Sequence, residues 1–280
     1  MDLIELNQRG LIPGPDEEEA SFQARAFYNL GLRNTLPTAN DGILQEAYPQ
    51  LKPYDITPDW VPVLFDNTHL SPWHGASAWI FQEEEHLPTG ALIQLRKTLS
   101  KKKTLLRWYR REDVTTHELC HVARMMFEEP KYEEILAYRS HGNWWGGLVQ
   151  SSTESMIFVL SLFLLVLVDF VTLNYGSWSL YLRFLPLKII PLALIAGASV
   201  RLFIRQRQVS RCLQNLNQWT PQPEAVLFRL TDREIEQFAK GIDMEAYAKS
   251  QHSPRWEVIR SYGEKAAKAA SISSSLAASL

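Results

Sequence analysis

Cysteine is scarce in this 280-residue chain, which has only Cys120 and Cys212. Two cysteines cannot build the disulfide framework of a small secreted domain, so we expect a reducing compartment. Residues 1–5 carry acids and lack the basic and then apolar pattern of a cleaved export signal. Neither sign of charge dominates, because the formal net charge is −2. We therefore expect a largely cytoplasmic protein with no nucleic-acid partner.

Long apolar runs are confined to the middle of the chain. Residues 156–173 form an 18-residue run with one charge, Asp169, and a second run over 184–200 is interrupted by Lys188 and two prolines. A membrane-spanning helix needs about 20 apolar residues, so these runs predict a transmembrane hairpin over 154–204 in a lipid bilayer. The two charges are expected either to pair at similar depth or to reach the same interface.

Basic residues are concentrated beyond the second apolar run. The connection between the runs has only Arg183, whereas the second run is followed by Arg201, Arg205, Arg207 and Arg211. The positive-inside rule therefore predicts that the N-terminal and C-terminal regions both face the cytoplasm.

The part before the hairpin, residues 1–150, is predicted to be an α+β domain. Short β-type runs at 61–65, 76–81 and 91–95 are separated by turn-forming residues, which predicts a small mixed sheet. Helical patterns follow the sheet, the first from Asp113 or Thr115 to about Phe127 and the second over 131–140.

The part after the hairpin, residues 205–280, is predicted to be a helical region. Thr231 stands three residues before Glu234, the spacing of a capping box at the start of a helix. The end of the chain, from about residue 269, is rich in serine and alanine and is expected to be disordered.

The segment His117-Glu118-Leu119-Cys120-His121 has the spacing of a metal site. Two histidines four residues apart on a helix share one face, where both imidazoles can bind one tetrahedral zinc ion. A glutamate directly after the first histidine is placed to take a proton from a zinc-bound water. A match arises by chance in roughly one chain in a hundred of such composition, so its surroundings decide.

Here the sequence resembles the zincin metallopeptidases over residues 60–141, and within them the gluzincins, whose third ligand is a glutamate. Several such families carry that ligand as Glu-x-x-Ala, as in Glu134-Ile135-Leu136-Ala137. The resemblance implies a zinc ion held by His117, His121 and Glu134, with Glu118 as general base.

The chain also departs from the gluzincin pattern. Only 12 residues separate His121 from Glu134, fewer than in many gluzincins. The membrane-bound heat-shock metalloproteases, to which the architecture is similar, usually have aspartate where this chain has Tyr138. Glu133, Glu129 and His141 therefore remain alternative third ligands.

Other residues near the motif have predicted roles. Zincins hold the substrate backbone along an upstream edge strand, and the resemblance assigns this role to Ala76, Ser77 and Ala78, although an ordinary core strand fits equally well. Cys120 is expected to be a buried helix residue rather than a ligand. The candidates for stabilising an oxyanion are Tyr132, Tyr138, Arg139 and His141.

The leading functional hypothesis is a membrane-anchored zinc metallopeptidase that cleaves a peptide or a membrane protein at the cytoplasmic face. One alternative is a non-catalytic membrane scaffold that binds a partner protein and carries an inactive motif. Another is a zinc hydrolase that acts on a different bond, because metal-bound hydroxide attacks many carbonyl centres.

Overall fold

The structure, a computed structural model, describes residues 1–36, 42–71, 74–82, 88–105, 109–148 and 152–264. The serine- and alanine-rich end of the chain lies outside these residues. The contacts divide the described chain into two compact units. Residues 1–143 and 208–264 form the mixed unit, and residues 144–207 form the hairpin unit. The segment after the apolar runs thus belongs to the same unit as the segment before them.

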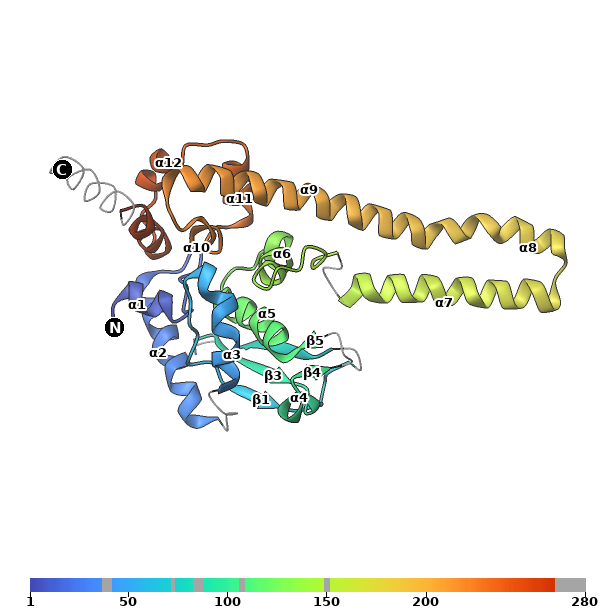
Figure 1. Ribbon diagram of the computed structural model, residues 1–280, viewed down its shortest axis with the longest axis horizontal. Coiled ribbons are helices and arrows are strands. Elements are labelled where there is room, and N and C mark those ends of the chain that lie inside the picture. Colours follow the sequence, from blue (N-terminus) through green and yellow to red (C-terminus); the bar gives the residue numbers. More distant parts are fainter. Residues whose placement is uncertain (37–41, 72–73, 83–87, 106–108, 149–151, 265–280) are drawn as a thin grey trace, which may run out of the picture. The chain divides into compact units, whose positions relative to one another are not determined.

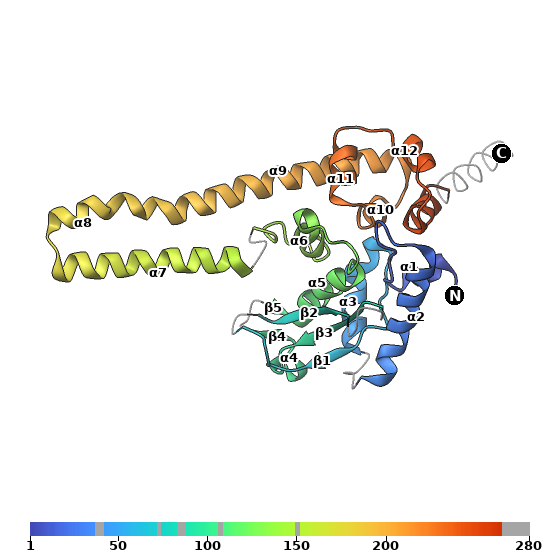
Figure 2. The same ribbon diagram turned by 180° about the vertical axis from the view of Figure 1, so that it is seen from behind.

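The mixed unit combines helices with a small sheet, as predicted (Figures 1 and 2). Before the hairpin its helices are α1 (Leu3–Gln8), α2 (Glu19–Thr35), α3 (Gly42–Leu51), the 3-10 turn η1 (Lys52–Tyr54), α4 (Thr98–Lys101), α5 (Arg111–Ala123) and α6 (Pro130–Arg139). After the hairpin follow α10 (Pro223–Leu227), α11 (Asp232–Ala239), α12 (Met244–Ser250) and a helical stretch over 254–264.

Three strands form the main sheet in the order β1-β3-β2. They are β1 (Val63–Phe65), β2 (Ala76–Phe81) and β3 (Gly90–Leu95), close to the three predicted runs. Strand β3 is central, parallel to β1 and antiparallel to β2. Two shorter strands, β4 (Thr104–Leu105) and β5 (Tyr109–Arg110), form a separate pair. Within the described chain, β2 is therefore an edge strand with one side open.

The register shows which backbone groups of β2 face that open side. Arg96 N donates to Gly75 O, so Gly75 and every second residue after it bond to β3. Ala78 stands opposite Ile93, whose own N–H turns away to Pro62 O of the β1 side. The backbone groups of Ala76, Ala78 and Ile80 consequently point to the open edge.

Helix α5 lies against β2, β3 and α3. It begins at Arg111, two residues before Asp113, the first of the two residues predicted as its start. Asp113 is not the N-cap, because its side chain accepts a hydrogen bond from Gln50 Nε2 at 2.7 Å. It ends at Ala123, earlier than Phe127, and α6 begins with Pro130 at its first turn, where proline is tolerated. Cys120 is buried on the helix, as expected.

The segment after the hairpin is joined to the N-terminal segment by buried polar contacts. The guanidinium of Arg229 is fully buried and donates to Asn7 Oδ1 at 2.7 Å and to Tyr54 O at 2.9 Å. The capping box predicted at Thr231 and Glu234 is present at the start of α11. A buried charge needs such partners, so these contacts fix how the two segments pack within the mixed unit.

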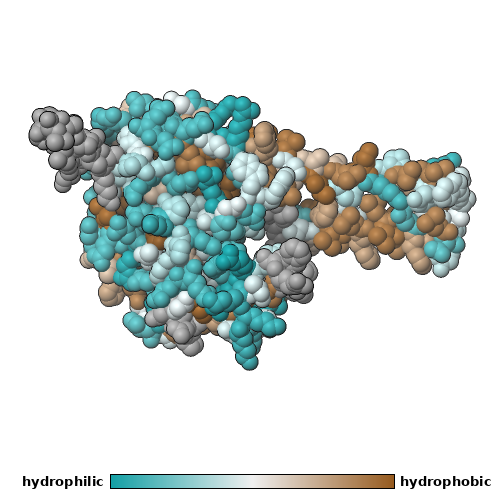
Figure 3. Space-filling model, in the orientation of Figure 1, coloured by the Kyte–Doolittle hydropathy of each residue, from teal (hydrophilic) through white to brown (hydrophobic). Residues whose placement is uncertain are grey.

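The hairpin unit contains α7 (Ser152–Tyr175), α8 (Trp178–Phe184), the 3-10 turn η2 (Leu185–Lys188) and the first part of α9 (Ile189–Trp219). Two stretches, Thr153–Tyr175 and Trp178–Trp219, are helices long and apolar enough to cross a membrane. Their apolar side chains are mostly exposed (Figure 3). Lys188 Nζ lies 2.9 Å from Asp169 Oδ2, so the two charges pair.

Candidate metal site

Helices α5 and α6 bring together one carboxylate and two imidazoles. His117 and His121 lie one turn apart on α5, with their Nε2 atoms 3.1 Å apart. Glu134 on α6 places Oε2 at 3.5 Å from His117 Nε2 and Oε1 at 3.5 Å from His121 Nε2. The three side chains are 15%, 19% and 24% exposed, so the group is largely shielded but still accessible to solvent.

The spacing of these atoms is compatible with a shared metal ion. Tetrahedral zinc with bonds of about 2.0–2.2 Å separates its ligand atoms by about 3.3–3.6 Å. The two 3.5 Å separations lie in that range, although each goes to a different oxygen of Glu134. The 3.1 Å separation of the two histidine nitrogens is shorter and also falls within the hydrogen-bond range of about 2.7–3.2 Å. His117, His121 and Glu134 are thus a three-residue group that could hold a metal ion.

Burial and charge set the protonation of this group. Burial lowers the pKa of His117 well below its usual value of 6.5, and nearby His121 and His141 lower it further. Burial also lowers the pKa of His121, but its hydrogen bond to Glu133 and the surrounding carboxylates outweigh this effect and raise that pKa to about 9. Burial raises the pKa of Glu134. A metal ion would replace the proton of His121.

The alternative third ligands have other contacts. Glu133 accepts from His121 Nδ1 at 3.2 Å, on the ring side away from His117. Glu129 accepts the backbone N–H of Asp232. The ring of His141 lies 6.5 Å from that of His117, so it stands beside the group rather than in it.

Glu118 connects the candidate metal group to the open edge of β2. Its Oε2 accepts the backbone N–H of Ala78 at 2.6 Å. Burial raises the pKa of its carboxyl, while His121 and the Ala78 bond act in the opposite direction. Of the predicted substrate residues, Ala78 touches the general-base candidate, Ala76 has its backbone on the same edge, and Ser77 pairs with Gln94 of β3.

No known family model, curated protein or solved structure matches this chain. The geometry of the site itself is therefore the basis for inferring a function.

The four predicted oxyanion candidates occupy different surroundings. The ring of Tyr138 lies 4.4 Å from the ring of His117, and His141 lies next to Tyr138 at 5.6 Å. Arg139 forms an ion pair with Glu224 at 2.8 Å, and Tyr132 donates to Gln208 Oε1 at 2.6 Å. Tyr138 and His141 are thus beside the metal group, whereas Arg139 and Tyr132 hold α6 to the segment after the hairpin.

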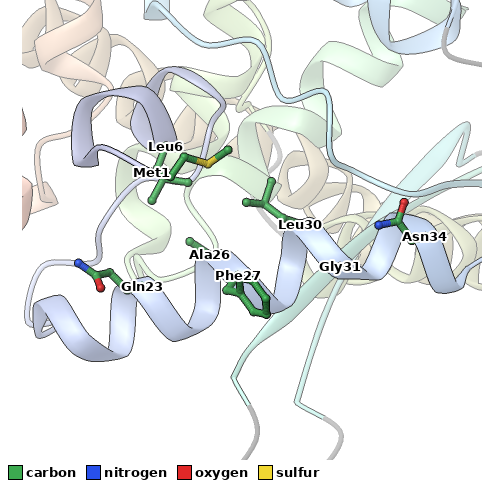
Figure 4. A pocket seen from close by; sticks show the side chains of 8 residues that line it. All are labelled: Met1, Leu6, Gln23, Ala26, Phe27, Leu30, Gly31 and Asn34. Carbon is green, nitrogen blue, oxygen red and sulfur yellow. The ribbon is translucent and has the colours of Figure 1, made fainter.

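An apolar pocket along α2 offers no comparable chemistry. It is lined by Met1, Leu6, Gln23, Ala26, Phe27, Leu30, Gly31 and Asn34 (Figure 4). None of these side chains is a general acid or base, or a histidine, cysteine or carboxylate ligand.

Arg124 is the residue near the site that the sequence analysis did not identify. It follows the motif by three residues, is fully buried, and donates from Nε to Glu133 Oε2 at 2.6 Å. The only sequence signal is a cation amid the apolar residues Val122, Ala123 and Met125, since buried arginines need a partner.

Proposed function

We propose that this chain is a membrane-anchored zinc metallopeptidase of the zincin type. The observation that carries the proposal is that His117, His121 and Glu134 bring one ligand atom each within 4.8 Å of one another, with Glu118 on the same helix as the two histidines. A zinc ion bound there would lower the pKa of a water ligand to about 7 and polarise a carbonyl group.

The other residues have roles around the scissile bond. Glu118 takes a proton from the attacking water and passes it to the amine nitrogen as the C–N bond breaks. The Ala78 N–H holds this carboxylate at 2.6 Å, and the open edge of β2 receives an extended peptide. Tyr138, against the ring of His117, is the candidate donor to the developing oxyanion.

The apolar hairpin supports a location at a membrane. Two helices of sufficient length and apolar character tether the unit that carries the site. With the basic residues Arg201 to Arg211 in the later part of α9 on the cytoplasmic side, the site acts in the cytoplasm on peptides or on segments of membrane proteins near the bilayer.

The test uses the full chain purified in detergent. The wild type is expected to hold one equivalent of zinc by elemental analysis and to cleave members of a peptide library. His117→Ala is expected to lose both zinc and cleavage. Glu118→Gln is the matched variant, because the amide keeps the shape of the side chain and an oxygen for the Ala78 N–H but cannot accept a proton.

Glu118→Gln should retain zinc and lose cleavage. A wild-type protein that is folded but binds no zinc would overturn the proposal and favour a membrane scaffold. Cleavage that persists in Glu118→Gln would remove Glu118 from the role of general base. A zinc-loaded protein that leaves every peptide intact but hydrolyses esters would indicate a different hydrolase.

A further inference from the structure

The two ring nitrogens of His121 face different groups. Nε2 lies toward His117 and Glu134, at 3.1 and 3.5 Å, and Nδ1 lies 3.2 Å from Glu133 Oε1. A nitrogen that binds a metal carries no proton, so the proton of the neutral ring must sit on Nδ1. The bond to Glu133 selects this form and sets the angle of the ring.

Glu133 is itself held by a buried arginine. Its second oxygen, Oε2, accepts from Arg124 Nε at 2.6 Å, and the Arg124 side chain is 0% exposed. The guanidinium also lies over the ring of Phe127, 4.1 Å from the centroid. Both carboxylate oxygens of Glu133 are thus occupied, which distinguishes it from Glu134.

The anchor of Arg124 comes from the segment after the hairpin. Its Nη1 donates to the backbone carbonyls of Phe228 and Leu230, the latter at 3.3 Å. These carbonyls are 104 and 106 residues away in the sequence but lie in the same compact unit. These two acceptors are uncharged and hold the guanidinium in position. The ion pair that Arg124 forms is with Glu133.

We propose that Glu133 is a positioning residue that fixes the tautomer and orientation of His121, and that Arg124, anchored by the carbonyls of Phe228 and Leu230, holds Glu133 in place. The proposal rests on the metal site proposed above. It gives the segment after the hairpin a direct part in metal binding, although that segment supplies no ligand. Mutation of a residue that orients a metal-binding histidine typically weakens metal binding about 10–100-fold.

The same helix offers a matched control. Arg139 joins α6 to Glu224 at 2.8 Å and so ties α6 to the segment after the hairpin without contacting His121. Arg139→Met therefore removes one anchor of α6 and leaves the bonds among Arg124, Glu133 and His121 intact. It separates loss of orientation from a general loosening of the helix.

The experiment measures zinc affinity by chelator competition and the visible spectrum of the cobalt-substituted protein. Glu133→Ala is expected to weaken zinc about 10–100-fold and to alter the cobalt spectrum. Glu133→Gln has one acceptor oxygen for two donors, so about half of that free energy is lost, a factor of about 3–10. Arg139→Met should stay within about twofold of the wild type, with an unchanged spectrum.

Several results would overturn the proposal. Glu133→Ala and Glu133→Gln with wild-type affinity would show that the ring needs no support from this carboxylate. An equal loss in Arg139→Met would show that only the rigidity of α6 matters. Complete loss of zinc in Glu133→Ala, with zinc retained in Glu134→Ala, would make Glu133 a ligand. Wild-type protein that binds no zinc would remove the metal site itself, and that result is seen before any variant is made.

Discussion

The hydrogen bond from Ala78 N–H to Glu118 can be removed by a single substitution in β2. The Ala78 N–H points to the open edge of β2 and donates to Glu118 Oε2 at 2.6 Å. Ala78→Pro removes this donor without removing a bond of the ladder to β3, because the bonds of the ladder belong to Ser77 and its alternate neighbours. Proline is tolerated on an edge strand when its nitrogen faces outward.

The expected effect on catalysis follows from the geometry. The proline ring places Cδ about 1.5 Å from the nitrogen, and non-bonded atoms pack about 3.5 Å apart. The carboxylate oxygen, now 2.6 Å from the nitrogen, must therefore retreat by roughly 2 Å. Misplacement of a catalytic group by about 1 Å lowers the rate about 100-fold, so kcat/KM is expected to fall at least about 100-fold.

Steady-state cleavage of a library-derived peptide and zinc content are the two readouts. Zinc should remain at one equivalent, because Ala78→Pro alters no ligand. Ile80→Pro is the control, since its nitrogen also faces the open edge and the Glu118 bond stays intact. Wild-type kcat/KM in a folded, zinc-loaded Ala78→Pro protein would refute the assignment of Glu118 as a base positioned by β2.

Three further predictions concern protonation and charge. The pKa of His121 is about 9 without metal, so its contribution to the stability of the metal-free fold is complete below about pH 6.5 and is lost as the pH rises through 9. Zinc binding at pH 7.5 should release about one proton from this ring, seen calorimetrically in buffers of different ionisation enthalpy; heats independent of buffer would contradict this. Burial raises the pKa of Asp232 to about 6. The wild type should therefore lose stability relative to Asp232→Asn as the pH rises from about 4 to 6. A difference in the free energy of unfolding in urea between the two proteins that stays constant over this range would contradict the prediction. For the hairpin, the double variant Asp169→Ala/Lys188→Ala should insert into membranes better than either single variant, because an unpaired charge costs about 3 kcal/mol there; additive effects in a glycosylation-mapping assay would contradict pairing.

The extent of the strands and of the motif helix was largely predictable because it depends on local pattern. Strand β2 covers the predicted residues, since turn-forming residues flank an apolar run there. The start of α5 was predicted too late, because Asp113 finds a partner in Gln50, 63 residues earlier. A capping residue can be identified from sequence, but a distant competitor for its side chain cannot.

Within the site, the sequence favoured Glu134 over Glu133 by its place in a Glu-x-x-Ala pattern. The contacts separate the two further, because neighbouring helix residues point about 100° apart and only Glu134 reaches both Nε2 atoms. The position of Arg124 among apolar residues is a sequence signal for burial, but its distant partners cannot be predicted. Arg124 donates to the backbone carbonyls of Phe228 and Leu230. Every residue has a backbone carbonyl, so the sequence does not indicate which ones will accept a hydrogen bond.

The interruption of the mixed unit by the hairpin has a consequence for how the protein is made. The ribosome completes Glu134 some 94 residues before Phe228, and both apolar helices emerge in between. At about 5–20 residues per second this is a delay of roughly 5–20 s. During that time α6 and Arg124 lack the partners that follow the hairpin, while the apolar helices have already been synthesised. Chain order alone thus leaves the proposed metal site without its anchor from Phe228 and Leu230 until after the apolar helices have been synthesised.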